Sequence, residues 1–157
     1  MTTNVLIVDD DPEEVTRLAK WLEVKPEEYV HFNPRQFIRG KQALQFDAVF
    51  RALLKELQKR NPTVVILDLQ LHESVNIGGQ EFCRELRNRC PGLGLVCVTI
   101  MPQAQVGDQG KQWGADRVWT KGWSIDGKIS LPGEEARILR DLINNARHAV
   151  DCGNFDL

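Results

Sequence analysis

Five short strand-like runs, separated by segments with helical spacing, constrain the fold of this chain more than any other feature. Most of these runs are apolar without a break, and polar residues follow each of them. The runs cover residues 5–8, 29–32, 64–67, 95–98 and 117–120. Unbroken apolar runs, in contrast to alternating ones, are typical of strands that are buried on both faces. The pattern therefore predicts a parallel sheet.

The segments between these runs carry helical signals. Asp11 and Pro12 predict an N-cap and a first turn, and apolar residues then recur with helical spacing. This first helix carries its apolar residues within 15–22, and further helices are expected near residues 46–57, 80–89, 103–113 and 134–150. Strands that alternate with helices through right-handed crossovers predict an α/β fold. We expect a doubly wound, flavodoxin-like sheet with strand order 2-1-3-4-5 and helices on both faces.

Length and composition limit the possible classes of protein. The 157 residues suffice for one domain, expected at 1–150, with 151–157 as a C-terminal tail. A net charge of −2 gives no general attraction to nucleic acid, and no apolar run is long enough to span a membrane. No secretion signal is visible at Met1, and the four cysteines form no CxxC pair. We therefore expect a cytoplasmic protein with free, mostly buried thiols.

Four of the predicted strands are followed by side chains that can react or bind a ligand. Asp9 and Asp10 follow the first run, Asp68 follows the third, Thr99 the fourth and Lys121 the fifth. Each has an ordinary explanation alone, as a helix cap, a strand residue or a solvated lysine. In a doubly wound sheet, however, ligands bind beyond the carboxyl ends of the strands. We therefore expect these side chains to converge in one crevice.

The motifs at these positions resemble those of response-regulator receiver domains from two-component signalling. The motifs are Val-Asp-Asp-Asp-Pro at 8–12, Ile-Leu-Asp-Leu at 66–69, Val-Thr at 98–99, and Gly-Ala-Asp to Thr-Lys within 114–121. The resemblance covers nearly the whole chain in the family's order. It implies that the domain accepts a phosphoryl group from a histidine kinase or a phosphotransfer protein and then switches its protein contacts. It is not expected to be an enzyme.

The resemblance also implies a role for each site residue. Asp68 is the expected phosphoacceptor, a carboxylate nucleophile. Mg²⁺ is expected on Asp9, Asp10, Asp68 and the backbone carbonyl of Gln70, because clustered carboxylates repel one another without a cation. Thr99 is expected to hydrogen-bond the bound phosphoryl group. Lys121 is expected to neutralise its charge. A homodimer is compatible with this assignment.

Several positions depart from the family pattern. Val118 stands where an aromatic residue is usual, Gly122 replaces a proline, and Ile100 replaces a small residue. Trp119, beside Val118, should point to the opposite face of its strand. The segment 70–79 is longer than usual and contains His72, which we interpret as a surface residue. Without an aromatic residue at 118, we expect phosphorylation to alter the 122–131 segment and Trp123 within it. Residues 124–130 of this segment are predicted to form a small hairpin.

Two alternative functions remain at this stage. A pseudo-receiver would use the same fold as a phosphorylation-independent binding module, and Val118, Gly122 and Ile100 favour it. A phosphatase of the haloacid dehalogenase type would use Asp9 and Asp11, but its further motifs are missing. Three tryptophans, Trp113, Trp119 and Trp123, suggest a partner surface, although core packing is the better interpretation for one or two of them.

Overall fold

The computed structural model describes residues 4–37, 46–68, 79–99, 113–120 and 133–156. Within them a five-stranded parallel sheet has the order β2-β1-β3-β4-β5, as predicted. Its strands are β1 (Val5–Val8), β2 (Tyr29–Phe32), β3 (Val64–Asp68), β4 (Gly94–Thr99) and β5 (Arg117–Thr120). The α-helices are α1 (Pro12–Trp21), α2 (Phe46–Arg60), α3 (Gly79–Arg89), α6 (Glu134–Asn145) and α7 (Ala149–Cys152). Two 3₁₀ helices, η1 (Pro26–Glu28) and η2 (Pro34–Phe37), flank β2.

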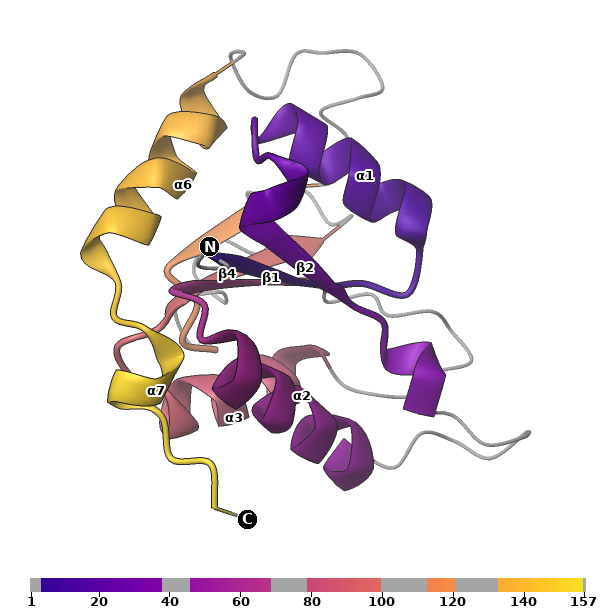
Figure 1. Ribbon diagram of the computed structural model, residues 1–157, viewed down its shortest axis with the longest axis vertical. Coiled ribbons are helices and arrows are strands. Elements are labelled where there is room, and N and C mark those ends of the chain that lie inside the picture. The colour runs from indigo at the N-terminus through magenta and orange to yellow at the C-terminus, as the bar shows by residue number, and fades with distance from the viewer. Residues whose placement is uncertain (1–3, 38–45, 69–78, 100–112, 121–132, 157) are drawn as a thin grey trace.

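The sheet lies between two helical layers, with α1 and α6 on one face and α2, α3 and α7 on the other (Figure 1). Alternate residues of the central strands enter two separate apolar cores. Val5 and Ile7 of β1 pack on the α1 face, whereas Leu6 and Val8 pack on the α2 and α3 face. Burial on both faces explains why these strands read as unbroken apolar runs.

The first helix begins as its sequence predicts. The Oδ1 atom of Asp11 accepts a hydrogen bond from the backbone N–H of Glu13 at 3.0 Å, and Pro12 occupies the first turn. Val15 and Leu18 from the inner side of α1 are buried against the sheet. The cap thus sets where α1 starts relative to the end of β1, which leaves only the residues 9–11 between strand and helix.

The last predicted helix, 134–150, is wrong at its C-terminal end. Helix α6 stops at Asn145, since Ala146 has an extended backbone with φ −80° and ψ 159°. The chain then crosses the amino ends of the strands, where Arg147 N–H donates to the carbonyl of Gly92 and Ala149 N–H donates to that of Pro62. Tertiary hydrogen bonds of this kind override local helical periodicity.

The crossing carries the chain from one layer to the other. Ala149 in α7 is fully buried in the core beneath α2 and α3, and Cys152 and Phe155 pack against that core. The Oδ1 atom of Asn61 accepts from Val150 N–H at 2.9 Å. Residues 151–156, expected as a tail, therefore contribute to the packed structure.

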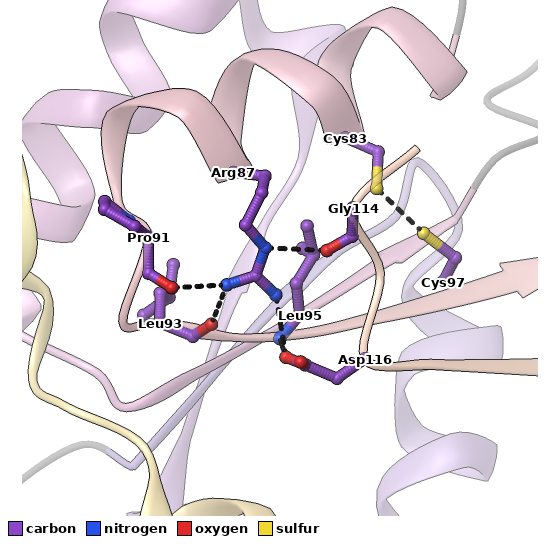
Figure 2. Close-up of polar contacts among 8 residues, drawn as sticks. All are labelled: Cys83, Arg87, Pro91, Leu93, Leu95, Cys97, Gly114 and Asp116. Atoms are coloured by element: carbon purple, nitrogen blue, oxygen red, sulfur yellow. Dashed lines mark hydrogen bonds and ion pairs between the residues drawn. The ribbon is translucent and has the colours of Figure 1, made fainter. Parts of the chain in front are cut away.

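Arg87 ties α3 to the turns that lead into β4 and β5 (Figure 2). Its guanidinium donates to the carbonyls of Gly114 at 2.6 Å and of Pro91 and Leu93 at 2.8 Å. It also pairs with Asp116 at 2.8 Å, and the same Asp116 oxygen accepts from Leu95 N–H at 2.8 Å. One side chain of α3 thus satisfies acceptors in two separate turns, the one before β4 and the one before β5.

Gly114 is required beside this guanidinium. Its φ is +90°, and a Cβ atom there would lie 2.7 Å from Cγ of Arg87. Both the backbone conformation and the close approach therefore exclude a side chain.

A second charged contact joins α6 to η1. Arg140 contacts both carboxylate oxygens of Glu28, at 2.5 and 3.0 Å. This hydrogen bonding lowers the pKa of Glu28 from 4.5 to about 2, against the opposing effect of partial burial. The pair therefore links α6 to η1, which leads directly into the edge strand β2.

Within the described residues, no helix combines the length and apolarity that crossing a bilayer would need. The cysteines are free, and three of the four are buried, as predicted. Trp113 and Trp119 are also buried, which confirms core packing for two of the three tryptophans.

We predict that Arg87→Ala destabilises the fold by about 2–4 kcal/mol, because it leaves the part-buried carbonyls of Gly114 and Leu93 without this donor and removes the ion pair with Asp116. Urea unfolding measures this change. The matched control is Arg84→Ala on the exposed side of the same helix, expected to change stability by less than about 0.5 kcal/mol. Equal effects of the two substitutions would show that the contacts of Arg87 do not stabilise the protein.

We predict that Glu28→Gln flattens the pH dependence of stability in acid. Because the pKa of Glu28 is about 2 in the folded protein and near 4.5 otherwise, the folded state binds fewer protons in this range. Its contribution is complete above about pH 4.5 and is lost as the pH falls through about 2. Unfolding free energies between these pH values should fall less steeply in the variant. Glu27→Gln removes the same charge at an exposed neighbour and serves as the control.

Candidate functional site

Two aspartates stand side by side at the carboxyl ends of the two central strands. Asp68 is the last residue of β3, and Asp9 directly follows β1. The strands pair in parallel with Val8 opposite Leu67, so Asp9 and Asp68 are the next residues along neighbouring strands. Only 5% of Asp9 and 3% of Asp68 is exposed. The fold therefore confirms the prediction that Asp9 and Asp68 come together.

Both carboxylates line one small cavity beneath α1. Its walls include Ile66 of β3, Val98 of β4 and Leu18 of α1, and Glu14 of α1 contributes a further acidic side chain. The cavity holds about 10 Å³, roughly the space for one water-sized particle. Apolar walls around carboxylates raise the free-energy cost of their charges, which favours a bound cation or an incoming cationic group.

Asp9 is held by hydrogen bonds from three directions. Its Oδ1 atom accepts from Asp11 N–H at 2.9 Å, and its own N–H donates to the carbonyl of Phe32 at 3.2 Å. Nε2 of His31 lies 2.7 Å from the carbonyl oxygen of Asp9. A carbonyl only accepts, so Nε2 carries the proton in this contact. These bonds fix the turn between β1 and α1.

Sequence reasoning missed His31 as part of the site. It lies in the middle of β2, where the register places it opposite Ile7. A lone histidine within a predicted strand gives no sign of its tertiary contact. Only the pairing of β2 beside β1 shows that its ring reaches the residue after β1.

Asp10 occupies a different position from its neighbours. Its side chain is 10% exposed, and its Oδ2 atom lies 3.7 Å from Nε of Arg35 in η2. Asp10 is not among the residues that line the cavity. Arg35 is a second residue that sequence reasoning missed, because its segment precedes α2 and shows no motif.

The proposed metal site has only part of its donor set within the described residues. Among those residues, no group of three or more histidine, cysteine or acidic side chains is arranged to hold a metal ion. Asp9 and Asp68 have the oxygen donors that Mg²⁺ prefers and line the same cavity. The expected carbonyl donor of Gln70 lies outside the described residues. The pair therefore suits Mg²⁺ chemically, and the full coordination stays a prediction.

The structure describes only some of the remaining residues expected in the site. Thr99 ends β4 and pairs with Thr120 at the same edge of the sheet as Asp68, which places its backbone as predicted. Other predictions lie outside the described residues, namely those for Ile100, His72, Lys121, Gly122 and Trp123, for the segments 70–79 and 122–131, for the hairpin at 124–130 and for the helix at 103–113.

Val118, which stands where the family usually has an aromatic residue, lies within the described part of the chain. Val118 is buried in the core on the α2 and α3 face, whereas Trp119 enters the core on the α1 face. The rings of Trp119 and Trp21 pack edge to face, with centroids 5.9 Å apart. The predicted alternation of these two side chains is confirmed. Trp119 thus does not occupy the face of Val118.

Comparisons with known proteins agree with the fold. The sequence profile of the family described as "Response regulator receiver domain" matches residues 5–128. No curated protein sequence matches the chain. The receiver domain of NtrX from Brucella abortus superposes with a TM-score of 0.63 at 16% identity, over 91% of this chain and 100% of that one.

Two further structures come from Thermotoga maritima. TrrA, determined in complex with Mg²⁺ and a beryllium fluoride, gives a TM-score of 0.57 at 21% identity, over 90% of this chain and 99% of that one. The response regulator DrrB gives 0.56 at 20% identity, over 94% of this chain. This chain spans 55% of DrrB. At these identities the likeness establishes the shared fold.

Proposed function

Because the chain belongs to the family of response-regulator receiver domains, we propose that it accepts a phosphoryl group on Asp68 and uses it to switch protein–protein contacts. One observation carries the proposal. Asp68 ends a central strand, is buried, and shares a cavity with the carboxylate of Asp9. This is the edge of a doubly wound sheet at which ligands bind.

The proposed reaction is phosphoryl transfer from a phosphohistidine. A carboxylate oxygen of Asp68 forms a bond to phosphorus while the bond from phosphorus to the histidine nitrogen breaks. The histidine nitrogen keeps the electron pair and takes up a proton, and Asp68 becomes an acyl phosphate. A histidine kinase or a phosphotransfer protein is therefore the proposed donor.

Charge is the main obstacle to this reaction. Two unit charges about 4 Å apart repel by about 4 kcal/mol at an effective dielectric of about 20, and the incoming phosphoryl group adds more negative charge. Mg²⁺ would supply the neutralising charge, held by Asp9, Asp68 and the carbonyl of Gln70, with Asp10 as the further carboxylate. Lys121 would neutralise the phosphoryl oxygens, and Thr99 would hydrogen-bond them.

The pseudo-receiver remains the second candidate, and one contact favours it. Arg35 pairs with Asp10 at 3.7 Å and so partly supplies in the protein itself the positive charge that a cation would bring. The cavity beside Asp68 is also small. A binding module that needs no phosphorylation could keep this ion pair.

The capping role of Asp11 argues against the haloacid dehalogenase alternative. That alternative would require Asp11 as a second catalytic carboxylate, but Asp11 caps α1 through Glu13 N–H. We therefore propose that the domain has no catalytic turnover of its own. A cytoplasmic location, the absence of nucleic-acid binding by this domain, and a homodimeric form remain parts of the same proposal.

We predict that acetyl phosphate with Mg²⁺ adds one phosphoryl group to the chain and that Asp68→Asn prevents it, because an amide is a poor nucleophile. Intact mass spectrometry measures the label. Asp141→Asn, an exposed carboxylate on α6, is the matched control and should be labelled like the wild type. Labelling of Asp68→Asn at the wild-type level would refute the acceptor assignment. A wild type that takes up no label would favour the pseudo-receiver.

We predict that Arg35→Ala tightens Mg²⁺ binding about two- to fivefold, since an exposed ion pair is worth about 0.5–1 kcal/mol. Removing Arg35 takes away a positive charge that competes with the cation for Asp10. Amide shifts in a Mg²⁺ titration report the dissociation constant. Arg51→Ala, exposed on α2, should leave it unchanged, and Asp10→Ala should abolish the response. Binding that survives Asp10→Ala would place the cation elsewhere.

A further inference from the structure

Two thiols face each other across the contact between α3 and β4. Sγ of Cys83 on α3 lies 3.3 Å from Sγ of Cys97 on β4, and both residues are fully buried. Figure 2 shows the two sulfur atoms pointing toward one another from the helix and the strand. Both are free thiols. The separation exceeds the roughly 2.05 Å length of a disulfide bond by only about 1.2 Å.

The surrounding contacts hold this pair in place. Arg87 lies one helical turn after Cys83 and donates to the carbonyl of Leu93, just before β4. It also binds Asp116, whose carboxylate accepts from Leu95 N–H, two residues before Cys97 on the same strand. The helix and the strand are thus tied together directly beside the thiols. A fixed pair of groups reacts at a high effective concentration.

The two sulfurs are not equivalent. The hydrogen bond with Cys97 lowers the pKa of the Cys83 thiol. The same hydrogen bond, together with burial, raises the pKa of the Cys97 thiol. Cys83 is therefore the sulfur that ionises first, and a thiolate is the form that reacts with oxidants. Burial raises the pKa of Cys90 to about 11 and raises that of Cys152, so neither shares this activation.

We propose that Cys83 and Cys97 form a redox modification site, at which a small peroxide converts the thiol pair into an intramolecular disulfide. The Cys83 thiolate attacks one peroxide oxygen, the O–O bond breaks, and a sulfenic acid forms with release of water after protonation. The Cys97 sulfur then attacks Sγ of Cys83, the S–O bond breaks, and a second water leaves. In total, two thiols are oxidised and one hydrogen peroxide is reduced to two waters.

The burial of both residues determines when this reaction occurs. A peroxide reaches Cys83 only during a local opening of α3 from the sheet, so oxidation is slower than at an exposed thiol. In a reducing compartment the pair stays as thiols, and thiol reductants reverse the cross-link. The disulfide therefore records oxidative exposure, independently of phosphorylation.

The cross-link would act next to the candidate phosphorylation site. Cys97 pairs in register with Leu67, the residue before Asp68. A disulfide would join α3 covalently to the strand adjacent to β3 and would close a segment in which the cysteines are 14 positions apart. The oxidised form is thus expected to suppress opening of α3 from the sheet.

The test treats the full chain with hydrogen peroxide, blocks remaining thiols and maps tryptic peptides without reduction. The linked peptides are then fragmented in the mass spectrometer, because Cys90 and Cys97 share the tryptic peptide 90–111. The expected product is a peptide pair joined through Cys83 and Cys97, with the intact mass lowered by about 2 Da for the two lost hydrogens. Dithiothreitol should restore the original mass. Hydrogen exchange within α3 should slow in the oxidised protein. Cys83→Ala should lose the cross-link, and Cys152→Ala, at a half-buried thiol, should retain it.

Three results would overturn the proposal. One is oxygen addition at Cys83 without a cross-link to Cys97. Another is a disulfide that involves Cys90, Cys152 or a second molecule in place of this pair. The third is that Cys83 and Cys97 remain thiols throughout treatment. Because fragmentation of the wild-type linked peptides decides each of these outcomes, the conclusion does not depend on whether Cys83→Ala folds.

Discussion

The parallel pairing of β1 with β3 places two buried carboxylates next to one another at the end of the sheet. Val8 lies opposite Leu67, so the chain delivers Asp9 and Asp68 to the same edge and the same cavity. The backbone positions of both residues are fixed, because each belongs to or adjoins a strand buried on both faces. Like charges in an apolar setting are costly, and a nearby positive charge reduces that cost. The chemistry proposed for this domain follows from that electrostatic demand.

Other residues of the protein supply part of the hydrogen bonding and positive charge near these aspartates. Backbone N–H of Asp11 hydrogen-bonds the carboxylate of Asp9, and Arg35 stands near Asp10. His31 fixes the backbone between them through the carbonyl of Asp9. These contacts fix the acidic turn between β1 and α1.

The opposite end of the sheet is built for stability. There Arg87 joins α3 to the turns before β4 and β5, and the chain after α6 crosses beneath the strands to bury Ala149. The thiol pair lies between these anchors and the carboxylate edge. The contacts that tie the helices to these turns are thereby separated from the carboxylate edge. This division is common in doubly wound folds, where the carboxyl edge carries the ligands.

The sequence alone determined the five strands, their parallel order and the gathering of Asp9 and Asp68, because unbroken apolar runs and strand-terminal residues are local patterns with a single consistent topology. It also determined that Val118 and Trp119 enter opposite cores, since strand alternation is a property of the backbone. The tertiary structure alone decided that α6 ends at Asn145, that His31 and Arg35 belong to the site, and that Cys83 meets Cys97. Each of these depends on contacts between segments far apart in the chain, or on hydrogen bonds that outweigh local propensity, and no local pattern records such contacts.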